Sequence, residues 1–243
     1  MTSKANPIPK VLFGAGRQAA HVMDLMEWIG LPWQEVVLFD DAFPQQQMGP
    51  RNRPILGALE SGIAYCVDNA LPAMVAMGSR TAAVRYATYM KLREAGVPLA
   101  SLVHPSCLIA PTATLGCNVI IMPGCVIGAQ VTIGSMCCLF SNVTLEHNAR
   151  IGDNVVFGPG VVVSGDVKIG KHAFVGAGVV CAPEVSIGER ALIAAGAVVV
   201  SNVPSGVIAM GVPARVHREA PAGSDVPTLD ELLNLGIGQS DGD

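Results

Sequence analysis

The side chains of this chain that could best catalyse a reaction are its few histidines. Four of the five, His104, His147, His172 and His217, follow residue 100, in a stretch that is otherwise apolar and rich in glycine. His147 lies near the middle of this stretch, in the segment Leu145-Glu146-His147-Asn148. A neutral imidazole can act as a general base, so the chemistry open to His147 depends on which groups the fold places beside it.

An apolar residue recurs at every sixth position of this stretch, seventeen times without a break. Four residues after each of these positions stands Ala, Val or Cys, and the residue directly after it is glycine eight times. Neither an α-helix nor an ordinary strand repeats every six residues, whereas a hexapeptide β-helix does, because each hexapeptide forms one short strand and one tight corner. The seventeen positions are Val103, Ile109, Leu115, Ile121, Ile127, Ile133, Leu139, Leu145, Ile151, Phe157, Val163, Ile169, Val175, Cys181, Ile187, Ile193 and Val199.

Three hexapeptides form one coil of such a β-helix, so the repeats predict about six coils of a triangular prism. Residues eighteen apart then lie almost directly above one another, on coils about 4.8 Å apart. Gly165 follows His147 by eighteen residues, which places the imidazole beside a backbone N–H of the next coil. The two groups could serve as general base and oxyanion donor in acyl transfer. A lone corner histidine is more often an ordinary surface residue.

The first hundred residues follow a different pattern, which predicts a small parallel α/β domain. Short apolar runs alternate with helical patterns, as in Rossmann-like folds that bind nucleotides at a glycine-rich turn. The runs and the residues after them are 11–13 with Gly14-Ala15-Gly16, 36–39 with Asp40-Asp41, and 74–77 with Gly78-Ser79-Arg80; helices are expected over 18–28 and through Glu94.

These patterns divide the chain into three parts. We expect a Rossmann-like substrate domain over residues 1–100, a β-helix domain over 101–218 and an acidic tail over 219–243. The segment 44–53 is rich in Gln, Pro and Gly and predicts an exposed loop. Within the tail, only residues 228–233 resemble a short capped helix.

The composition indicates which kinds of partner the protein could bind and in which compartment we expect it. A net charge of −4 disfavours a nucleic-acid partner. The N-terminus has no apolar signal core and no stretch is typical of a membrane span, so we expect a cytoplasmic protein without membrane insertion. A zinc site would need three converging histidines, and none joins His147 and His172, so no metal is expected. Four of the seven cysteines fall on interior positions of the repeat, where they act as small hydrophobic residues: Cys107, Cys125, Cys137 and Cys181.

Several short motifs occur in a characteristic order. They are Gly14-Ala15-Gly16, Asp40-Asp41, Val103-His104-Pro105, 146–152 (EHNARIG), 165–170 (GDVKIG) and 211–215 (GVPAR). In this order and spacing, the segment 102–218 resembles the left-handed β-helix, or hexapeptide-repeat, acyltransferases. The two-domain layout is similar to the bacterial nucleotide-sugar N-acetyltransferases and sialic acid O-acetyltransferases of surface-glycan biosynthesis.

The resemblance implies a homotrimer in which acetyl-CoA, as co-substrate, lies in a groove between neighbouring prisms. It implies that His147 removes a proton from the amine of a nucleotide-linked amino-sugar and that the Gly165 N–H stabilises the thioester oxygen, with Glu146 and Asn148 beside the base. The implied cofactor-binding residues are Gly165, Ala177, Ala195, Gly211, Pro213 and Arg215. The implied nucleotide-sugar residues are Gly14, Gly16 and Arg17 near the diphosphate, and Asp40 and Asp41 at the base or ribose.

Three residues depart from the pattern of this family. Arg17 replaces the glycine that usually follows Gly-x-Gly, and Asn148 replaces an acidic residue that orients the imidazole, a role that Glu146 or Asp166 could take. Val156 stands where several relatives carry a second histidine.

Two other functions stay open on this basis. One is a sialic-acid-type O-acetyltransferase, and the other is a non-catalytic β-helix that binds sugar nucleotides. A dehydrogenase is disfavoured because the glycine turn lacks its third glycine.

Overall fold

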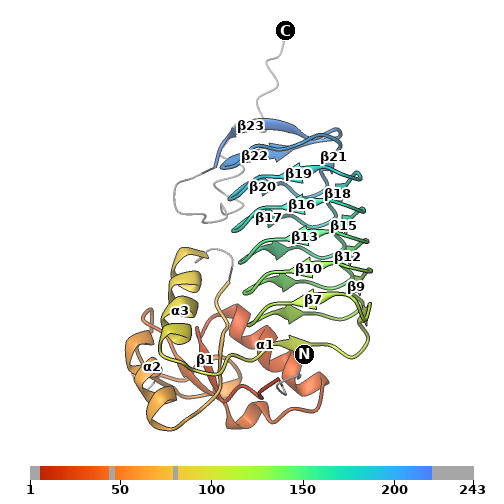
Figure 1. Ribbon diagram of the computed structural model, residues 1–243. Coiled ribbons are helices and arrows are strands. Elements are labelled where there is room, and N and C mark those ends of the chain that lie inside the picture. Colours follow the sequence, from red (N-terminus) through yellow and green to blue (C-terminus); the bar gives the residue numbers. More distant parts are fainter. Residues whose placement is uncertain (1–5, 44–46, 79–81, 221–243) are drawn as a thin grey trace.

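The computed structural model describes residues 6–43, 47–78 and 82–220, which form an α/β layer at the foot of a tall β-helix (Figure 1). The short helix expected over 228–233 lies outside the described residues, as does nearly all of the acidic tail. Among the described helices, none is both long and apolar enough to cross a membrane.

The N-terminal part contains a four-stranded parallel sheet in the order β3-β2-β1-β4. Its central strand β1 is fully buried, as its run of apolar residues predicts. The strands are β1 (Val11–Phe13), β2 (Val37–Phe39), β3 (Ile55–Gly57) and β4 (Ala73–Val75); the helices are α1 (Arg17–Trp28), α2 (Leu59–Asp68) and α3 (Ala82–Glu94), with short 3-10 turns η1 (Trp33–Glu35) and η2 (Pro50–Asn52). The sequence predicted all of these except β3, α2 and the two 3-10 turns.

The β-helix consists of two-residue strands stacked in three parallel sheets, with partners eighteen residues apart, such as Leu145 with Val163. We name its faces by what lies on them. The covered face packs against the N-terminal part and has strands β5 (Leu102–Val103), β8 (Ile120–Ile121), β11 (Cys138–Leu139), β14 (Val156–Phe157), β17 (Phe174–Val175) and β20 (Leu192–Ile193). The apolar face has β6 (Leu108–Ile109), β9 (Val126–Ile127), β12 (Thr144–Leu145), β15 (Val162–Val163), β18 (Val180–Cys181) and β21 (Val198–Val199). The polar face has β7 (Thr114–Leu115), β10 (Thr132–Ile133), β13 (Arg150–Ile151), β16 (Lys168–Ile169) and β19 (Ser186–Ile187).

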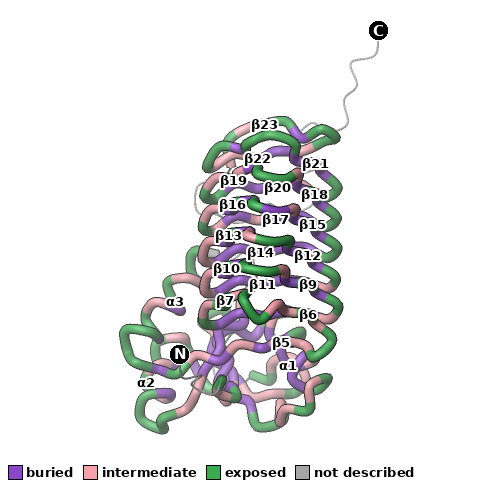
Figure 2. Tube along the Cα trace, turned by 45° about the vertical axis from the view of Figure 1, so that its right-hand side comes forward, coloured by how far each residue is buried: buried purple, intermediate pink, exposed green. Residues whose placement is uncertain are grey.

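The six-residue period has a direct physical cause at the corners between faces. A Cβ added to Gly152 would lie 2.7 Å from the backbone nitrogen of Lys171 on the next coil, so only glycine allows the coils to stack there. Further along the same corner, Asn154 has a left-handed backbone with φ of 59°, as does Asn142 on the next corner of the coil below, with φ of 61°. From Ile121 to Val199 the repeat residues fill a buried interior that runs up the prism (Figure 2), whereas Leu115, near the foot, is exposed.

Two strands close the far end of the prism. β22 (Val207–Met210) continues the covered face, and β23 (Arg215–Glu219) returns antiparallel to it. Residues 211–214 form the turn between them, in which Ala214 is buried.

The N-terminal part is joined to the β-helix by packing and by buried polar contacts. Ile120, Cys138 and Val156 point outward from the covered face into one apolar cluster with α1. The Asn118 side chain accepts a hydrogen bond from the Val75 N–H at 2.8 Å and donates one to the Val75 carbonyl at 3.2 Å. These contacts fix the sheet of the N-terminal part against one face of the prism.

Candidate active site

His147 lies on the corner between the apolar and polar faces, and its imidazole covers Gly165 on the next coil. A Cβ added to Gly165 would lie 2.5 Å from Nε2 of His147 and would overlap its Cε1. The imidazole can therefore occupy this position only because residue 165 has no side chain. The sequence predicted this juxtaposition from the spacing of eighteen residues.

The backbone N–H of Gly165 is free to bind a ligand. It donates to no acceptor within the described residues, although the Gly165 carbonyl accepts from Glu184. Pro183 occupies the equivalent corner position one coil further on, so the stacking of coils does not use this N–H. Nε2 of His147 and the Gly165 N–H thus lie side by side, as a base and an oxyanion donor require.

Gly165→Ala is expected to lower kcat by about 10²- to 10³-fold, because the new methyl displaces the imidazole from its position over residue 165 and disturbs the oxyanion donor. Steady-state kinetics would measure the loss. Pro183→Ala, at the same corner one coil on, is the matched control and should keep kcat within about twofold; equal losses in both variants would contradict the assignment.

The other ring nitrogen of His147 has two polar neighbours. Nδ1 lies 3.4 Å from the Asn148 amide nitrogen and 3.7 Å from Oδ2 of Asp166. Glu146 is exposed, and its carboxylate contacts neither nitrogen among the described groups. Of the two acidic residues considered from the sequence, Asp166 is the one beside the imidazole.

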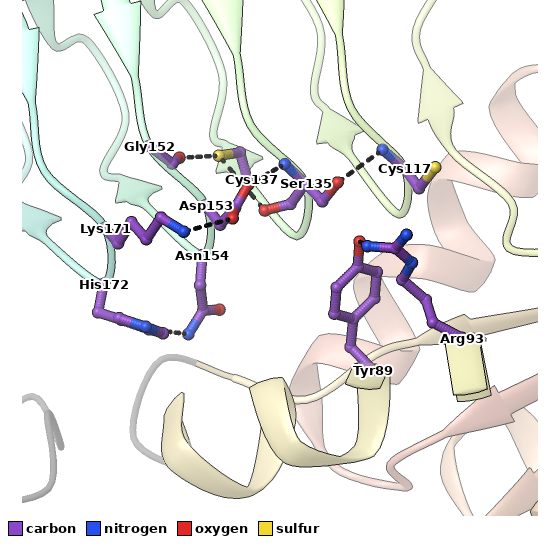
Figure 3. A network of polar contacts seen from close by, with 10 residues as sticks. All are labelled: Tyr89, Arg93, Cys117, Ser135, Cys137, Gly152, Asp153, Asn154, Lys171 and His172. Atoms are coloured by element: carbon purple, nitrogen blue, oxygen red, sulfur yellow. Dashed lines mark hydrogen bonds and ion pairs between the residues drawn. The ribbon is translucent and has the colours of Figure 1, made fainter. Parts of the chain in front are cut away.

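His172 lies on a different corner and is part of the packing against α3 (Figure 3). Its ring meets Tyr86 edge-on at 4.8 Å, and Nδ1 lies 2.9 Å from the Asn154 amide nitrogen. Burial lowers the pKa of His172 because it disfavours the charged imidazolium. Within the described ranges, no three His, Cys, Asp or Glu side chains gather as metal ligands would.

The glycine turn and the acidic pair of the N-terminal part line one hollow of about 570 Å³. It lies at the carboxyl ends of β1, β2 and β4, where open parallel sheets bind ligands. The residues predicted to bind the nucleotide-sugar all line it: Gly14, Gly16, Arg17, Asp40 and Asp41.

The structure separates the roles of the two aspartates. Both oxygens of Asp40 already accept backbone N–H groups, from Ala15 at 2.6 Å and from Ala42 at 2.8 Å. Asp41 is exposed, and within residues 6–43, 47–78 and 82–220 it accepts a hydrogen bond from the Leu59 N–H alone, at 2.8 Å. Asp40 therefore holds the glycine turn in place, and Asp41 keeps an oxygen for a ligand; the contact of either residue with a ribose or base stays a prediction.

Apart from Gly165, the residues predicted to bind acetyl-CoA do not meet His147 within one chain. Ala177 and Ala195 are exposed on the corner between the covered and apolar faces, whereas His147 and Gly165 lie at the opposite edge of the apolar face. Gly211 and Pro213 are exposed in the closing turn, and Arg215 is exposed at the start of β23. The predicted site is therefore split between two corners.

The structure shows where two of the residues that depart from the family pattern lie, Val156 and Arg17. Val156 is 6% exposed and packs in the apolar cluster with α1, so this contact fills the position at which the family resemblance implied a second histidine. Arg17 begins α1 and is exposed at the mouth of the hollow.

Comparison with known proteins places this geometry in a family. Residues 131–165 and 166–201 match the bacterial transferase hexapeptide (six repeats) family. The chain carries the repeats of this transferase family and is an acyltransferase of this fold. No curated protein sequence matches it. The family, the enzyme class and the fold class predicted from the sequence, a Rossmann-like part followed by a left-handed β-helix, are confirmed.

Solved structures resemble this acyltransferase over most of its length. PerB from Caulobacter crescentus, in complex with CoA and GDP-perosamine, is 29% identical, covers 85% of this chain and 96% of its own, and has a TM-score of 0.77. WeeI from Acinetobacter baumannii is 25% identical over 85% of this chain and 98% of its own, with a TM-score of 0.72. The acetyltransferase domain of PglB from Neisseria gonorrhoeae, in complex with acetyl coenzyme A, shares the fold at 23% identity, over 87% of this chain and all of its own, with a TM-score of 0.78.

Proposed function

We propose that this acyltransferase moves the acetyl group of acetyl-CoA to the amine of a nucleotide-linked amino-sugar. The observation that carries the proposal is the position of His147, whose Nε2 edge lies over Gly165. The likeness to PerB, which binds CoA and GDP-perosamine, supports both substrates. Sialic-acid-type O-acetylation is the alternative acceptor chemistry.

The reaction uses these two groups in sequence. As the amine attacks the thioester carbonyl, its proton passes to Nε2 of His147. The Gly165 N–H binds the oxyanion of the tetrahedral intermediate. Collapse of the intermediate expels the CoA thiolate, which takes the proton back from the imidazolium, and leaves the acetylated amine.

A threefold assembly would join the two halves of the site. The outward residues of the apolar face carry no charge, and four are large and exposed: Leu108, Val126, Val162 and Val180. A contiguous apolar surface of this kind is typical of a subunit contact. With this face toward a threefold axis, the His147 corner of one subunit meets the other edge of the next subunit's apolar face, which carries Ala177 and Ala195 of the partner subunit. Small side chains there leave room for pantetheine.

Asp41→Asn is expected to raise the acceptor KM about tenfold and to leave the acetyl-CoA KM unchanged. The amide keeps an oxygen for the Leu59 N–H but removes the charge offered to a ribose or base. Initial-rate kinetics with each substrate varied in turn would measure both constants. Asp40→Asn is the comparison: it should lower stability to heat, because one oxygen that accepts a backbone N–H is replaced by an NH₂ donor. Equal rises in both KM values for Asp41→Asn would contradict the proposal that the N-terminal part binds the nucleotide-sugar and the β-helix binds acetyl-CoA.

The direct test measures release of the CoA thiol from acetyl-CoA with UDP-, GDP- and dTDP-linked amino-sugars, CMP-sialic acid and free sialic acid. Turnover with an amino-sugar nucleotide supports the proposal and identifies the acceptor. Turnover only with sialic acids favours O-acetylation. Absence of both turnover and acetyl-CoA binding by calorimetry would favour a non-catalytic protein that binds sugar nucleotides.

A further inference from the structure

A column of polar residues follows the corner that carries His147. Asn148, Asp166 and Glu184 are eighteen residues apart, and each turns the corner in the left-handed conformation, with φ of 60°, 60° and 62°. Because these residues stack, the side chain next to His147 on one side is an amide from its own coil, and on the other side a carboxylate from the coil above.

The two neighbours of Nδ1 demand opposite tautomers of His147. If the Asn148 amide donates to Nδ1 across 3.4 Å, Nδ1 must carry the lone pair and Nε2 the proton. A carboxylate can only accept, so pairing with Asp166 at 3.7 Å puts the proton on Nδ1 and frees the lone pair of Nε2. Nε2 is the nitrogen beside the Gly165 oxyanion donor, so only the second tautomer can remove a proton there.

We propose that Asp166 is the positioning residue of this site: its carboxylate selects the Nδ1–H tautomer of His147 and stabilises the imidazolium formed during the reaction. The inference rests on the proposed function. The position of the acid differs from that expected of the family, since it comes from the next coil and not from the residue that follows the histidine.

The geometry allows the contact to tighten without a change of fold. The Asp166 N–H donates to the His147 carbonyl at 2.9 Å, which fixes the two backbones relative to each other. The side chains of His147 and Asp166 are 60% and 50% exposed, so a small rotation of either closes the remaining gap, as is common when a substrate binds. Arg150, Lys168 and Glu184 line the same hollow beside Asp166 and are the charged groups that could compete for it.

The first test compares Asp166→Asn with Glu184→Gln, which makes the same change of charge one coil further along the column. In Asp166→Asn we expect kcat to fall about fivefold, the upper end of what an exposed charge pair contributes, with both KM values unchanged. Glu184→Gln should keep kcat within about twofold. An unchanged kcat in Asp166→Asn, or an equal fall in Glu184→Gln, would overturn the proposal.

The second test moves the carboxylate from position 166 to position 148. In the double variant Asn148→Asp/Asp166→Asn the carboxylate stands next to His147 on its own coil and should restore most of the lost kcat. A double variant no faster than Asp166→Asn, while equally well folded, would show that the carboxylate at 166 does not act through the imidazole.

A third measurement needs no acceptor substrate. The ¹⁵N shifts of the imidazole distinguish Nδ1–H from Nε2–H, and comparison with His147→Ala assigns the His147 signals among five histidines. The wild-type protein should show mainly Nδ1–H, and Asp166→Asn should shift the population toward Nε2–H. An unchanged tautomer contradicts the role of Asp166 even if the enzyme is active, whereas an inactive protein with the expected tautomer shift would count against the proposed function alone.

Discussion

Replacing His147 with alanine is expected to lower kcat by about 10²- to 10⁴-fold, the range typical for the loss of a general base. The side chain is exposed and lies against Gly165, Asn148 and Asp166. The bond from the Asp166 N–H to the carbonyl of residue 147 involves only backbone and remains. The variant should therefore fold, assemble and bind acetyl-CoA like the wild-type protein.

Kinetics, calorimetry with CoA and the oligomeric mass would be measured on the same preparation. His104→Ala is the matched control, since His104 lies in a corner near the foot of the β-helix, where its Nδ1 contacts the Ser106 hydroxyl at 2.7 Å. Its kcat should stay within about twofold. Near-normal turnover of His147→Ala would refute the assignment of the base. A variant of a perosamine N-acetyltransferase with one histidine replaced by alanine has been crystallised with CoA and GDP-perosamine, so loss of a histidine need not prevent binding in a related enzyme.

The sequence predicted the β-helix almost residue by residue. Every one of the seventeen repeat positions is the second residue of a two-residue strand, from Val103 at the end of β5 to Val199 at the end of β21. The strand positions could be predicted this accurately because every hexapeptide meets the same two requirements. Its inward residue must fit a narrow interior, and its corner must pass close to the next coil. The juxtaposition of His147 and Gly165 followed from the same register.

The sequence could not predict features that depend on contacts between distant segments. The strand β3 has only three residues, and α2 begins without a side chain hydrogen-bonded at its N-cap, so neither gives a clear local signal. The use of both Asp40 oxygens depends on which backbone N–H groups surround them in the fold. The burial of Val156 depends on how α1 lies on the covered face. The homotrimer, the domain bounds and the cytoplasmic location stay predictions.

The assembly can be tested through one residue of the apolar face. Val162 points outward from β15, which lies between β12 and β18 within that sheet, and it is 37% exposed in a single chain. In the proposed trimer, Val162→Glu would place a carboxylate from each subunit in an apolar contact, where an unpaired buried charge costs several kcal/mol. We expect monomers with an intact β-helix, since this side chain does not enter the prism interior.

The proposed site would be lost with the assembly, because His147 and the partner subunit's Ala177 line the acetyl-CoA groove only across the subunit contact. Acetyl-CoA turnover should therefore fall by more than about 10²-fold, since the oriented binding of the thioester is lost, although His147 and Gly165 are untouched. Mass by light scattering, circular dichroism and initial rates would be measured together, with Thr114→Glu on the polar face as a control that should stay trimeric and active. A monomeric Val162→Glu variant that retained full activity would mean that one chain contains the whole site, and a trimeric one would mean that another surface holds the subunits together.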